Sequence, residues 1–294
     1  MLDTQPQHSQ CQPGPVAPTR FAQPPGLTDC HIHIFGTGNP YPFTPERRFT
    51  PNEAPPSQYA AVCEALGIQR GVLVQPSVYG VDNRRLIAAR SELGIPTRLV
   101  VMVPADVNHA ELERLSRDGA VGVRLIGTVP GGAPLSSIDA LSDKLHEHGW
   151  HIQVLLNPQL MLDYEDRLAK SRCRLVIDHM AQVPARQGVN QDAFRALLRL
   201  VDTGRVWVKC SAPFHLSTQP APYADLAPLV RELARTRPDR VLWGSDWPCV
   251  NFHGDCHEPA NFLDAVHHWL PNEEDRLRMF VDNPAELYGF GKTP

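Results

Sequence analysis

The chain has 294 residues, of which 42% are hydrophobic and 20% charged, so it can bury a core of good size. Its formal net charge of −4 gives no electrostatic reason to expect nucleic acid or an acidic membrane surface as a partner. No apolar run approaches the ~20 residues that a membrane helix needs, so we expect no membrane association.

The 7 cysteines are scattered through the chain and form no Cys-x-x-Cys pattern. Several of them lie inside apolar runs, where a free cysteine packs as a small hydrophobic residue. The N-terminus lacks the basic segment followed by an apolar one that a secretory signal requires. Together these features predict a cytoplasmic protein.

Residues 1–25 are rich in proline and glutamine and have almost no apolar periodicity. Such a composition does not build a core, so we expect a flexible N-terminal tail whose removal costs neither activity nor stability. The remainder, residues 26–294, has about the length of one eight-stranded α/β barrel, roughly 250 residues. We therefore predict a single folded domain after the tail.

From residue 26 onward, short apolar runs alternate with amphipathic helical segments. The strand-like runs are 27–35, 71–77, 97–104, 121–127, 151–157, 174–179, 205–211 and 241–246. The helical segments are 57–66, 83–93, 108–118, 137–148, 158–170, 192–202, 223–236 and 258–269. Alternation of this kind predicts parallel βα units and, with this number of units, a (β/α)8 TIM barrel. An open doubly wound sheet is the alternative, but no Gly-x-Gly-x-x-Gly follows the first strand.

Two further segments carry local signals. The loop over residues 36–56 is dense in proline, phenylalanine and arginine and is too long for a plain connection, so we expect a lid or a pocket wall. Near the C-terminus, Asn283 is expected to cap a short helix that has Pro284 in its first turn.

The first strand carries the sequence Asp29-Cys30-His31-Ile32-His33. Alternate residues of a strand face the same side, so His31 and His33 should project together, with Cys30 and Ile32 on the other face. Two imidazoles on one face can share a metal ion or one substrate oxygen. The alternative is a pair of hydrogen-bonded structural histidines.

Active sites of α/β barrels lie at the C-terminal ends of the strands. The predicted strand ends contribute a set of polar residues: His31, His33, Gln75, Ser77, Arg124, Asn157, Asp178, His179, Lys209, Ser211 and Asp246. Asp246 could instead cap a turn, and His179 could be a core histidine. Cys30, Cys210 and Cys249 are expected to pack rather than react.

Arg124 lies between Val123 and Leu125 on an apolar strand, and a buried guanidinium needs an anion. We favour a substrate carboxylate over a protein partner such as Asp178. Three imidazoles and a carboxylate can polarise a carbonyl group and activate a water molecule beside it. Asp246 would take the proton of that water, and the reaction would be hydrolysis at an acyl carbon.

Several segments together resemble the amidohydrolase superfamily, in the branch of the 2-pyrone-4,6-dicarboxylate lactonases. They are residues 28–36 (TDCHIHIFG), 41–51 (YPFTPERRFTP), 73–83 (LVQPSVYGVDN), 122–124 (GVR), 177–180 (IDHM), 208–211 (VKCS), 243–248 (WGSDWP) and 283–287 (NPAEL). The resemblance implies a TIM barrel of the metal-dependent-hydrolase type that opens a small lactone in aromatic catabolism.

The resemblance also assigns roles. It makes Asp246 the base and places the lactone carbonyl on His31, His33 and His179. Substrate-binding candidates are Arg124 and Ser77, which would hold a carboxylate, and also Gln75, Tyr79, Lys209 and Asn251. No cofactor is expected to be required. The alternative is one divalent zinc ion on His31, His33, His179 and Asp246.

The chain departs from the dicarboxylate pattern in ways that affect the substrate. Residues 128–132 and 212–217 contain no arginine, and Phe49 stands where a tyrosine is expected. A lactone with a single anionic group, or a neutral one, is therefore at least as well supported as the pyrone dicarboxylate. A metal-dependent decarboxylase of an aromatic acid is the second hypothesis, and a binding protein on an inactive barrel is the third. The protein is expected to be a monomer or a homo-oligomer.

Overall fold

The computed structural model describes residues 7–8, 16–36, 40–129, 133–250 and 258–291. Its centre is a sheet of eight strands in the order β10-β9-β8-β7-β6-β5-β4-β2, in which every neighbouring pair is parallel. These strands are β2 (Thr28–Ile32), β4 (Arg70–Val74), β5 (Thr97–Val101), β6 (Ala120–Ile126), β7 (His151–Leu155), β8 (Arg174–Ile177), β9 (Val206–Cys210) and β10 (Val241–Trp243). The predicted (β/α)8 barrel is confirmed.

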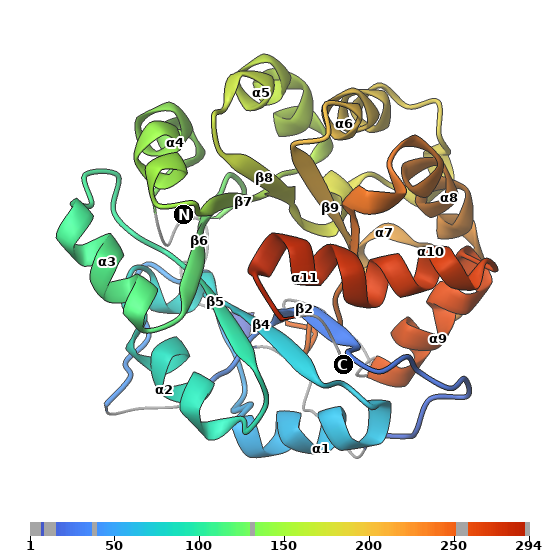
Figure 1. Cartoon of the computed structure of the whole chain (residues 1–294), viewed down its shortest axis with the longest axis horizontal. Coiled ribbons are helices and arrows are strands. Elements are labelled where there is room, and N and C mark those ends of the chain that lie inside the picture. Colours follow the sequence, from blue (N-terminus) through green and yellow to red (C-terminus); the bar gives the residue numbers. More distant parts are fainter. Residues whose placement is uncertain (1–6, 9–15, 37–39, 130–132, 251–257, 292–294) are drawn as a thin grey trace.

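Helices surround the barrel, and those from α1 to α8 lie between successive strands (Figure 1). These are α1 (Pro56–Leu66), α2 (Arg84–Glu92), α3 (His109–Arg117), α4 (Ile138–Glu147), α5 (Pro158–Lys170), α6 (Asp192–Asp202), α7 (Pro213–Leu216) and α8 (Ala227–Thr236). After the last strand come α9 (Pro259–Trp269), α10 (Glu273–Leu277) and α11 (Asn283–Tyr288). A two-stranded sheet pairs β1 (Gln7–His8) with β3 (Phe49–Thr50). None of the helices in the described residues is long and apolar enough to cross a membrane.

The barrel closes where β2 meets the segment that follows β10. The His33 amide donates to the Trp247 carbonyl at 2.8 Å, and the Asp246 amide donates to the His31 carbonyl at 3.0 Å. Gly244 has no side chain because a Cβ there would lie 2.8 Å from the His31 Cβ and 3.0 Å from its amide nitrogen. This close approach brings the first and last strand ends together.

The barrel interior is apolar below the polar strand ends. One cluster of buried residues contains Cys30, Val72, Val74, Val100, Val176, Trp207, Leu242, Leu287, Tyr288 and Phe290. Its last three members come from α11 and the residues after it, which lie across one end of the barrel (Figure 1). Leu287 and its neighbours therefore close that end.

The prediction that Cys30 and Ile32 share one face of the first strand is wrong. Cys30 belongs to the interior cluster, whereas Ile32 packs in the layer that contains Leu27 and Val62. The β2–β4 pairing shifts register between Asp29 and Ile32, so the alternation is interrupted there.

The predicted helix cap at Asn283 is also wrong. A π-helical turn over Arg278–Asp282 leads directly into α11, so this helix has no free first turn to cap. The Asn283 side chain instead donates to the carbonyl groups of Pro238 at 2.9 Å and Val241 at 2.8 Å. It ties α11 to the start of β10.

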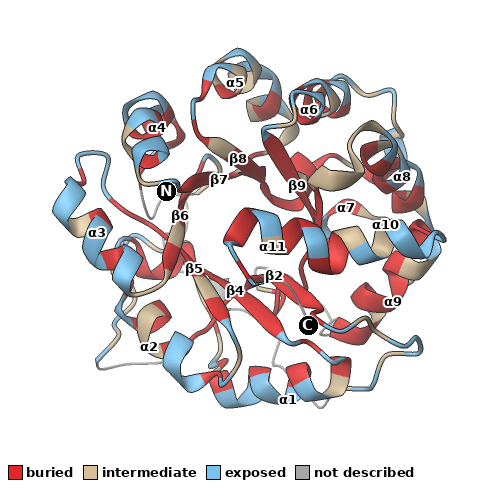
Figure 2. Ribbon diagram, in the orientation of Figure 1, coloured by how far each residue is buried: buried red, intermediate tan, exposed pale blue. Residues whose placement is uncertain are grey.

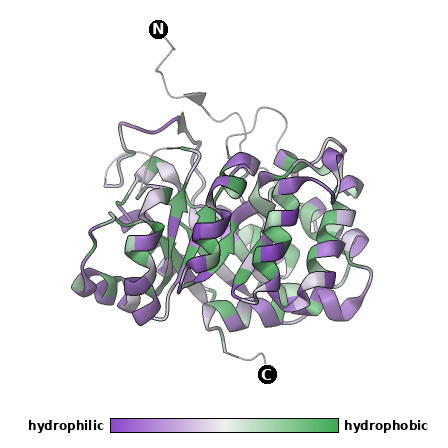
Figure 3. Ribbon diagram, turned by 90° about the horizontal axis from the view of Figure 1, so that it is seen from above, coloured by the Kyte–Doolittle hydropathy of each residue, from purple (hydrophilic) through white to green (hydrophobic). Residues whose placement is uncertain are grey.

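A second apolar layer fills the space between strands and helices. The barrel strands are almost entirely buried, and most of the helices bury one face, whereas the short α10 buries no residue (Figure 2). The hydropathy of the ribbon follows the same division, with apolar strands inside and hydrophilic residues on the outer helix faces (Figure 3). Such burial holds the strand ends in fixed positions, which a catalytic site requires.

Residues 16–25 contact the barrel. The Thr19 hydroxyl donates to Asp264 Oδ1, and the Arg20 amide lies 3.1 Å from both oxygens of that carboxylate. The Phe21 ring stacks on His267 of α9 at a centroid distance of 4.1 Å. Because Asp264 is only 7% exposed, these donors stabilise a carboxylate that has little access to water. This part of the expected tail is attached to the domain.

Removal of residues 1–25 is therefore expected to lower the melting temperature by several degrees, since about 1 kcal/mol corresponds to roughly 2–4 °C in a chain of this size. Removal of residues 1–15, which keeps Thr19, Arg20 and Phe21, serves as the comparison in the same thermal denaturation assay. Equal melting temperatures for the two truncations would show that the Asp264 contacts contribute nothing.

Candidate functional site

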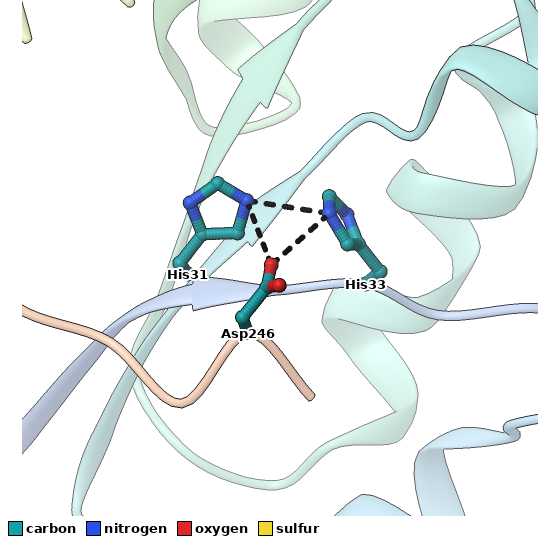
Figure 4. A group of neighbouring side chains, drawn as sticks. All are labelled: His31, His33 and Asp246. Carbon is teal, nitrogen blue, oxygen red and sulfur yellow. Dashed lines mark hydrogen bonds and ion pairs between the residues drawn. The ribbon is translucent and has the colours of Figure 1, made fainter. Parts of the chain in front are cut away.

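Three polar side chains meet at the seam where the barrel closes. His31 Nε2 lies 3.2 Å from His33 Nε2, and Asp246 Oδ1 lies 3.5 Å from the former and 3.7 Å from the latter. The two histidines project from the end of β2 toward the aspartate on the facing loop (Figure 4). All three residues are buried. The predicted meeting of His31, His33 and Asp246 is therefore present in the structure.

Asp29 holds the backbone of this seam in place. One of its oxygens accepts from the amides of His31 at 3.0 Å and Ser245 at 2.9 Å. The other accepts from the Tyr59 hydroxyl of α1 at 2.9 Å. The aspartate thereby fixes β2, the residues after β10 and α1 relative to one another. Sequence reasoning missed this role, because an aspartate in a strand gives no sign of its partners.

The proton positions of the two histidines follow from their neighbours. His33 Nδ1 lies 2.7 Å from the Val74 carbonyl oxygen, which can only accept, so Nδ1 carries the proton and Nε2 a lone pair. His31 Nδ1 lies 3.3 Å from Lys209 Nζ, a donor, and 3.3 Å from Asp178 Oδ1, an acceptor. Its surroundings therefore accommodate a proton on either ring nitrogen.

Below this group lies a buried network centred on Asp178. Its Oδ2 accepts from Arg124 Nε at 3.3 Å and Nη2 at 3.2 Å, and from Gln153 Nε2 at 3.0 Å. Lys209 Nζ donates to Gln153 Oε1 at 2.7 Å and lies 3.5 Å from Asp178 Oδ1. Lys209 and Asp178 are fully buried. Two cations thus share one carboxylate under the site.

This network corrects the prediction that Arg124 has no internal ion pair. Asp178 is its partner, and Arg124 Nη1 also donates to the Gln75 carbonyl at 3.1 Å. Three of its five N–H groups are used within the protein. The physical reason is that burying a guanidinium without an anion raises the free energy of the fold. Asp178, the residue directly after β8, supplies that anion.

His179 enters the site on an unusual turn. Residues His179, Met180, Ala181 and Gln182 have φ angles of 49°, 48°, 53° and 52°, a left-handed conformation that side chains other than glycine seldom adopt. His179 Nδ1 lies 2.8 Å from the Ser211 hydroxyl, and its Nε2 lies 3.8 Å from Asp246 Oδ1. The turn places the His179 ring beside the other two histidines.

A cavity of about 340 Å³ opens above these residues. It is lined by His33, Arg48, Phe49, Pro76, Ser77, Arg124, Ile126, Thr128, Val129, Leu155, His179, Gln182, His215, Asp246 and Val250. Its size suits a small molecule. Arg48 and Phe49 belong to the long loop before α1, so the predicted pocket wall is confirmed.

The predicted substrate-binding residues divide into two groups. Ser77 and Arg124 line the cavity. Gln75, Tyr79 and Lys209 do not: the Gln75 amide donates to the carbonyls of Gly80 and Asp82, and the Tyr79 hydroxyl bonds the Gly36 backbone. These three side chains support the walls instead.

Two further predictions concern residues at strand ends. Asn251 lies outside the described residues. Asn157, at the end of the fifth predicted strand, caps α5 by accepting from the Leu160 amide at 2.9 Å. It follows that Asn157 has a local structural role.

Sequence reasoning missed four residues of the site: Arg48, Gln153, Gln182 and His215. Gln153 lies on β7 with the period-2 pattern of an inward residue, a signal that could have found it. Arg48, Gln182 and His215 come from loops and short helical turns, where no periodicity predicts the direction of a side chain.

Burial controls the charges of the site. It lowers the pKa of His33 and of His179 to about 3, so both rings are neutral near pH 7. It raises the pKa of the Asp246 carboxyl to about 8, and the charge of Arg124 offsets part of that increase. Burial alone would raise the pKa of Asp178, but His31, Lys209 and Arg124 together lower it well below its usual range. Asp178 is therefore the permanent anion.

The three atoms at the seam suit one divalent metal ion. Zinc bound to nitrogen and oxygen at about 2.0–2.2 Å in a tetrahedral site separates its ligand atoms by roughly 3.3–3.6 Å. The separations among His31 Nε2, His33 Nε2 and Asp246 Oδ1 are 3.2, 3.5 and 3.7 Å. The lone pair on His33 Nε2 agrees with a ligand role. His179 belongs to a second possible group, with His31 and Asp178.

Comparison with known proteins places this geometry in context. The chain is 32% identical over 281 residues to a 4-sulfomuconolactone hydrolase of Hydrogenophaga intermedia, covering 93% of this chain and 92% of that protein. It is 31% identical to a 2-pyrone-4,6-dicarboxylate hydrolase of Comamonas testosteroni, covering 92% of each. The chain is 32% identical to a D-galactarolactone isomerase of Agrobacterium fabrum, over 91% of this chain and 92% of that protein.

A solved structure and a family profile agree with these relatives. An Agrobacterium tumefaciens protein in its apo form superposes with a TM-score of 0.86 at 30% identity, over 94% of this chain and 98% of that one. The profile of the Amidohydrolase family matches residues 28–290, which include every strand of the barrel. The chain belongs to the amidohydrolase family.

Proposed function

We propose that the protein hydrolyses the ester bond of a small lactone in aromatic catabolism, with Asp246 as the base that activates water. The observation that carries this proposal is the position of Asp246, which lines the cavity together with His33 and His179. Two relatives whose alignment with this chain covers 92% of their own length are named as hydrolases of a muconolactone and of a pyrone dicarboxylate. Their names support the same reaction class.

We infer the first step from the proton positions. A water molecule beside Asp246 and His33 Nε2 meets two acceptors, so both of its hydrogens are held and its oxygen lone pair is directed at the substrate. The Asp246 carboxylate takes one proton while the water oxygen attacks the lactone carbonyl carbon. His33 cannot donate to the carbonyl oxygen while its proton is on Nδ1, so we revise its expected role from carbonyl donor to water acceptor.

His179 is the better donor for the developing oxyanion. If the Ser211 hydroxyl donates to His179 Nδ1, the neutral ring carries its proton on Nε2, which faces the cavity side of Asp246. The tetrahedral intermediate then collapses with cleavage of the ring C–O bond. Asp246 returns its proton to the leaving alkoxide, and the product is a hydroxy acid.

His31, His33 and Asp246 would hold the divalent ion that fits this site, and such an ion polarises a carbonyl oxygen or lowers the pKa of water. With an ion bound, the His31 proton would lie on Nδ1, where Asp178 Oδ1 accepts it at 3.3 Å. Without one, the proton would lie on Nε2 and Nδ1 would accept from Lys209. In both forms Asp246 would remain the acceptor of the water proton. His33 Nε2 would accept a water hydrogen only when neither an ion nor a proton on His31 Nε2, 3.2 Å away, occupies its lone pair.

Substitution Asp246→Asn is expected to reduce turnover of a lactone by at least about a thousandfold, because it removes the proton acceptor. A lactone panel with a pH indicator measures this, and the wild-type product should be one equivalent of acid with no release of CO2. Release of CO2 from an aromatic acid would instead support decarboxylation. A variant that keeps several per cent of the wild-type rate would show that Asp246 is not the base.

The same variant should not lose stability. In the metal-free fold the pKa of Asp246 is raised from 3.8 to about 8, so the ionised carboxylate destabilises the folded state. This destabilisation grows as the pH rises from 3.8 to about 8. At pH 8 and above, Asp246→Asn should therefore melt at or above the wild-type temperature. A much lower melting temperature would mean that lost activity reflects misfolding.

Zinc is expected to raise the melting temperature of the wild-type protein after chelator treatment, and His33→Asn should abolish that increase. His109→Asn is the matched control, because His109 lies 3.0 Å from His148 in an exposed pair that could bind zinc weakly. Metal analysis after dialysis gives the stoichiometry. An equal increase in wild type and His33→Asn would remove His33 from the ligand set.

Substitution Arg124→Met is expected to lower the free energy of unfolding by about 3 kcal/mol, since it leaves the buried Asp178 with fewer partners. Urea denaturation measures this loss. Arg114→Met removes ion pairs of a half-exposed arginine on α3 and should have little effect. If Arg124→Met is as stable as the wild type, its pairing with Asp178 is energetically unimportant.

A further inference from the structure

Arg48 differs from the other charged residues of the cavity. It lies in the loop between β2 and α1, it is exposed, and it lines the cavity next to Phe49. Within the described part of the chain, its guanidinium has no hydrogen bond and no ion pair. The adjacent Arg47 is anchored, because its Nε donates to the Thr50 hydroxyl at 3.0 Å and its Nη1 to the Thr44 carbonyl at 3.1 Å.

The charges beneath the cavity compensate one another. Arg124 and Lys209 are the cations, and both lie within 3.5 Å of Asp178. Asp246 supplies the second carboxylate when it is ionised. Two positive charges therefore face the two carboxylates Asp178 and Asp246. A third buried carboxylate, Asp29, is held by two backbone amides and the Tyr59 hydroxyl. Arg48 takes part in none of these contacts.

The cavity lining contains both apolar and polar side chains. The apolar ones include Phe49, Ile126, Val129, Leu155 and Val250, and the polar ones include Ser77, Thr128, Gln182 and His215. His33, His179 and Asp246 are at most 4% exposed, whereas Arg48 is open to solvent at the cavity mouth. Among the described residues, the cavity thus combines the proposed catalytic groups, several apolar side chains and the unpaired guanidinium of Arg48, which suits an amphipathic ligand with one anionic end.

We propose that Arg48 selects lactones with a single oxyanion, a carboxylate or a sulfonate, on the side of the ring away from the reacting carbonyl. The inference rests on the proposed lactone hydrolysis and names its substrate class. A guanidinium binds either anion through two parallel N–H groups. Arg48, rather than the internally paired Arg124, is then the residue that distinguishes charged from neutral lactones.

The test compares three butenolides with the same ring. One carries a carboxymethyl group (CH2CO2−), one a sulfomethyl group (CH2SO3−) and one a methyl group. In Arg48→Met, KM for the two anionic lactones should rise by roughly 10–100-fold with kcat nearly unchanged, because the contact acts equally in ground and transition states. The neutral lactone should be unaffected. Arg48→Lys should recover part of the loss for both anions.

Arg117→Met is the matched control, since Arg117 is exposed on α3 and its loss changes the net charge equally. A similar KM increase in Arg117→Met would assign the effect to overall charge and overturn the inference. An equal loss for neutral and anionic lactones in Arg48→Met would do the same, because it would mean that Arg48 only shapes the loop. A larger effect on one anion identifies which of the two the cavity prefers.

A binding measurement separates this inference from the proposed reaction. Calorimetry with the carboxymethyl butenolide in an Asp246→Asn background, with and without Arg48→Met, reports recognition in the absence of turnover. Weaker binding after loss of Arg48, with no hydrolysis by the wild type, would support the anion site and reject the lactonase proposal. Equal affinity of Asp246→Asn and of the double variant with Arg48→Met would reject the role of Arg48, even if the wild type hydrolyses lactones.

Discussion

One buried carboxylate, Asp178, organises the polar half of the barrel. It accepts from Arg124 and Gln153 and lies 3.5 Å or less from Lys209 and His31. Four strands therefore converge on two oxygen atoms. Because charges buried without partners are strongly unfavourable, the arrangement holds only when every member is present. His31 contacts this network directly and His179 follows Asp178 in the chain, so the positions of these two histidines depend on a residue that is not among the cavity lining.

The closure of the barrel gives the second constraint. The hydrogen bonds between the end of β2 and the segment after β10 bring His31, His33 and Asp246 within 3.7 Å of one another. Asp29 reinforces the same seam through three hydrogen bonds. The chain thereby joins residues more than 200 positions apart through several hydrogen bonds. Fold and site are here the same structural feature.

The sequence predicted the fold well because the periodic signals are strong and local. Runs such as 158–170 and 192–202 coincide with α5 and α6, and every strand of the barrel lies within or one residue beyond its predicted range. His-x-His and Asp246 were found because strand ends of a barrel share one face. The pairing of Arg124 with Asp178 could not be found, since periodicity gives the face of a side chain but not its partner.

Arg48 and Asn283 have structural roles that could not be predicted from the sequence. The direction of a loop residue such as Arg48 depends on tertiary contacts, which the spacing of apolar residues does not encode. Asn283 carried a correct local signal for a helix start, but the π turn before α11 removed the free amides that it would have capped. In such places the packing of whole helices and strands overrides the local conformational preference of a residue.

The left-handed turn over residues 179–182 has a consequence for any attempt to engineer this enzyme. Four consecutive side chains are held in a conformation that glycine tolerates far better. A selection for thermal tolerance would thus tend to introduce glycine at Ala181 rather than at Met180, whose buried side chain fills part of the core. The same change would loosen the turn that positions the His179 ring, so heat resistance and the order of the candidate site compete there.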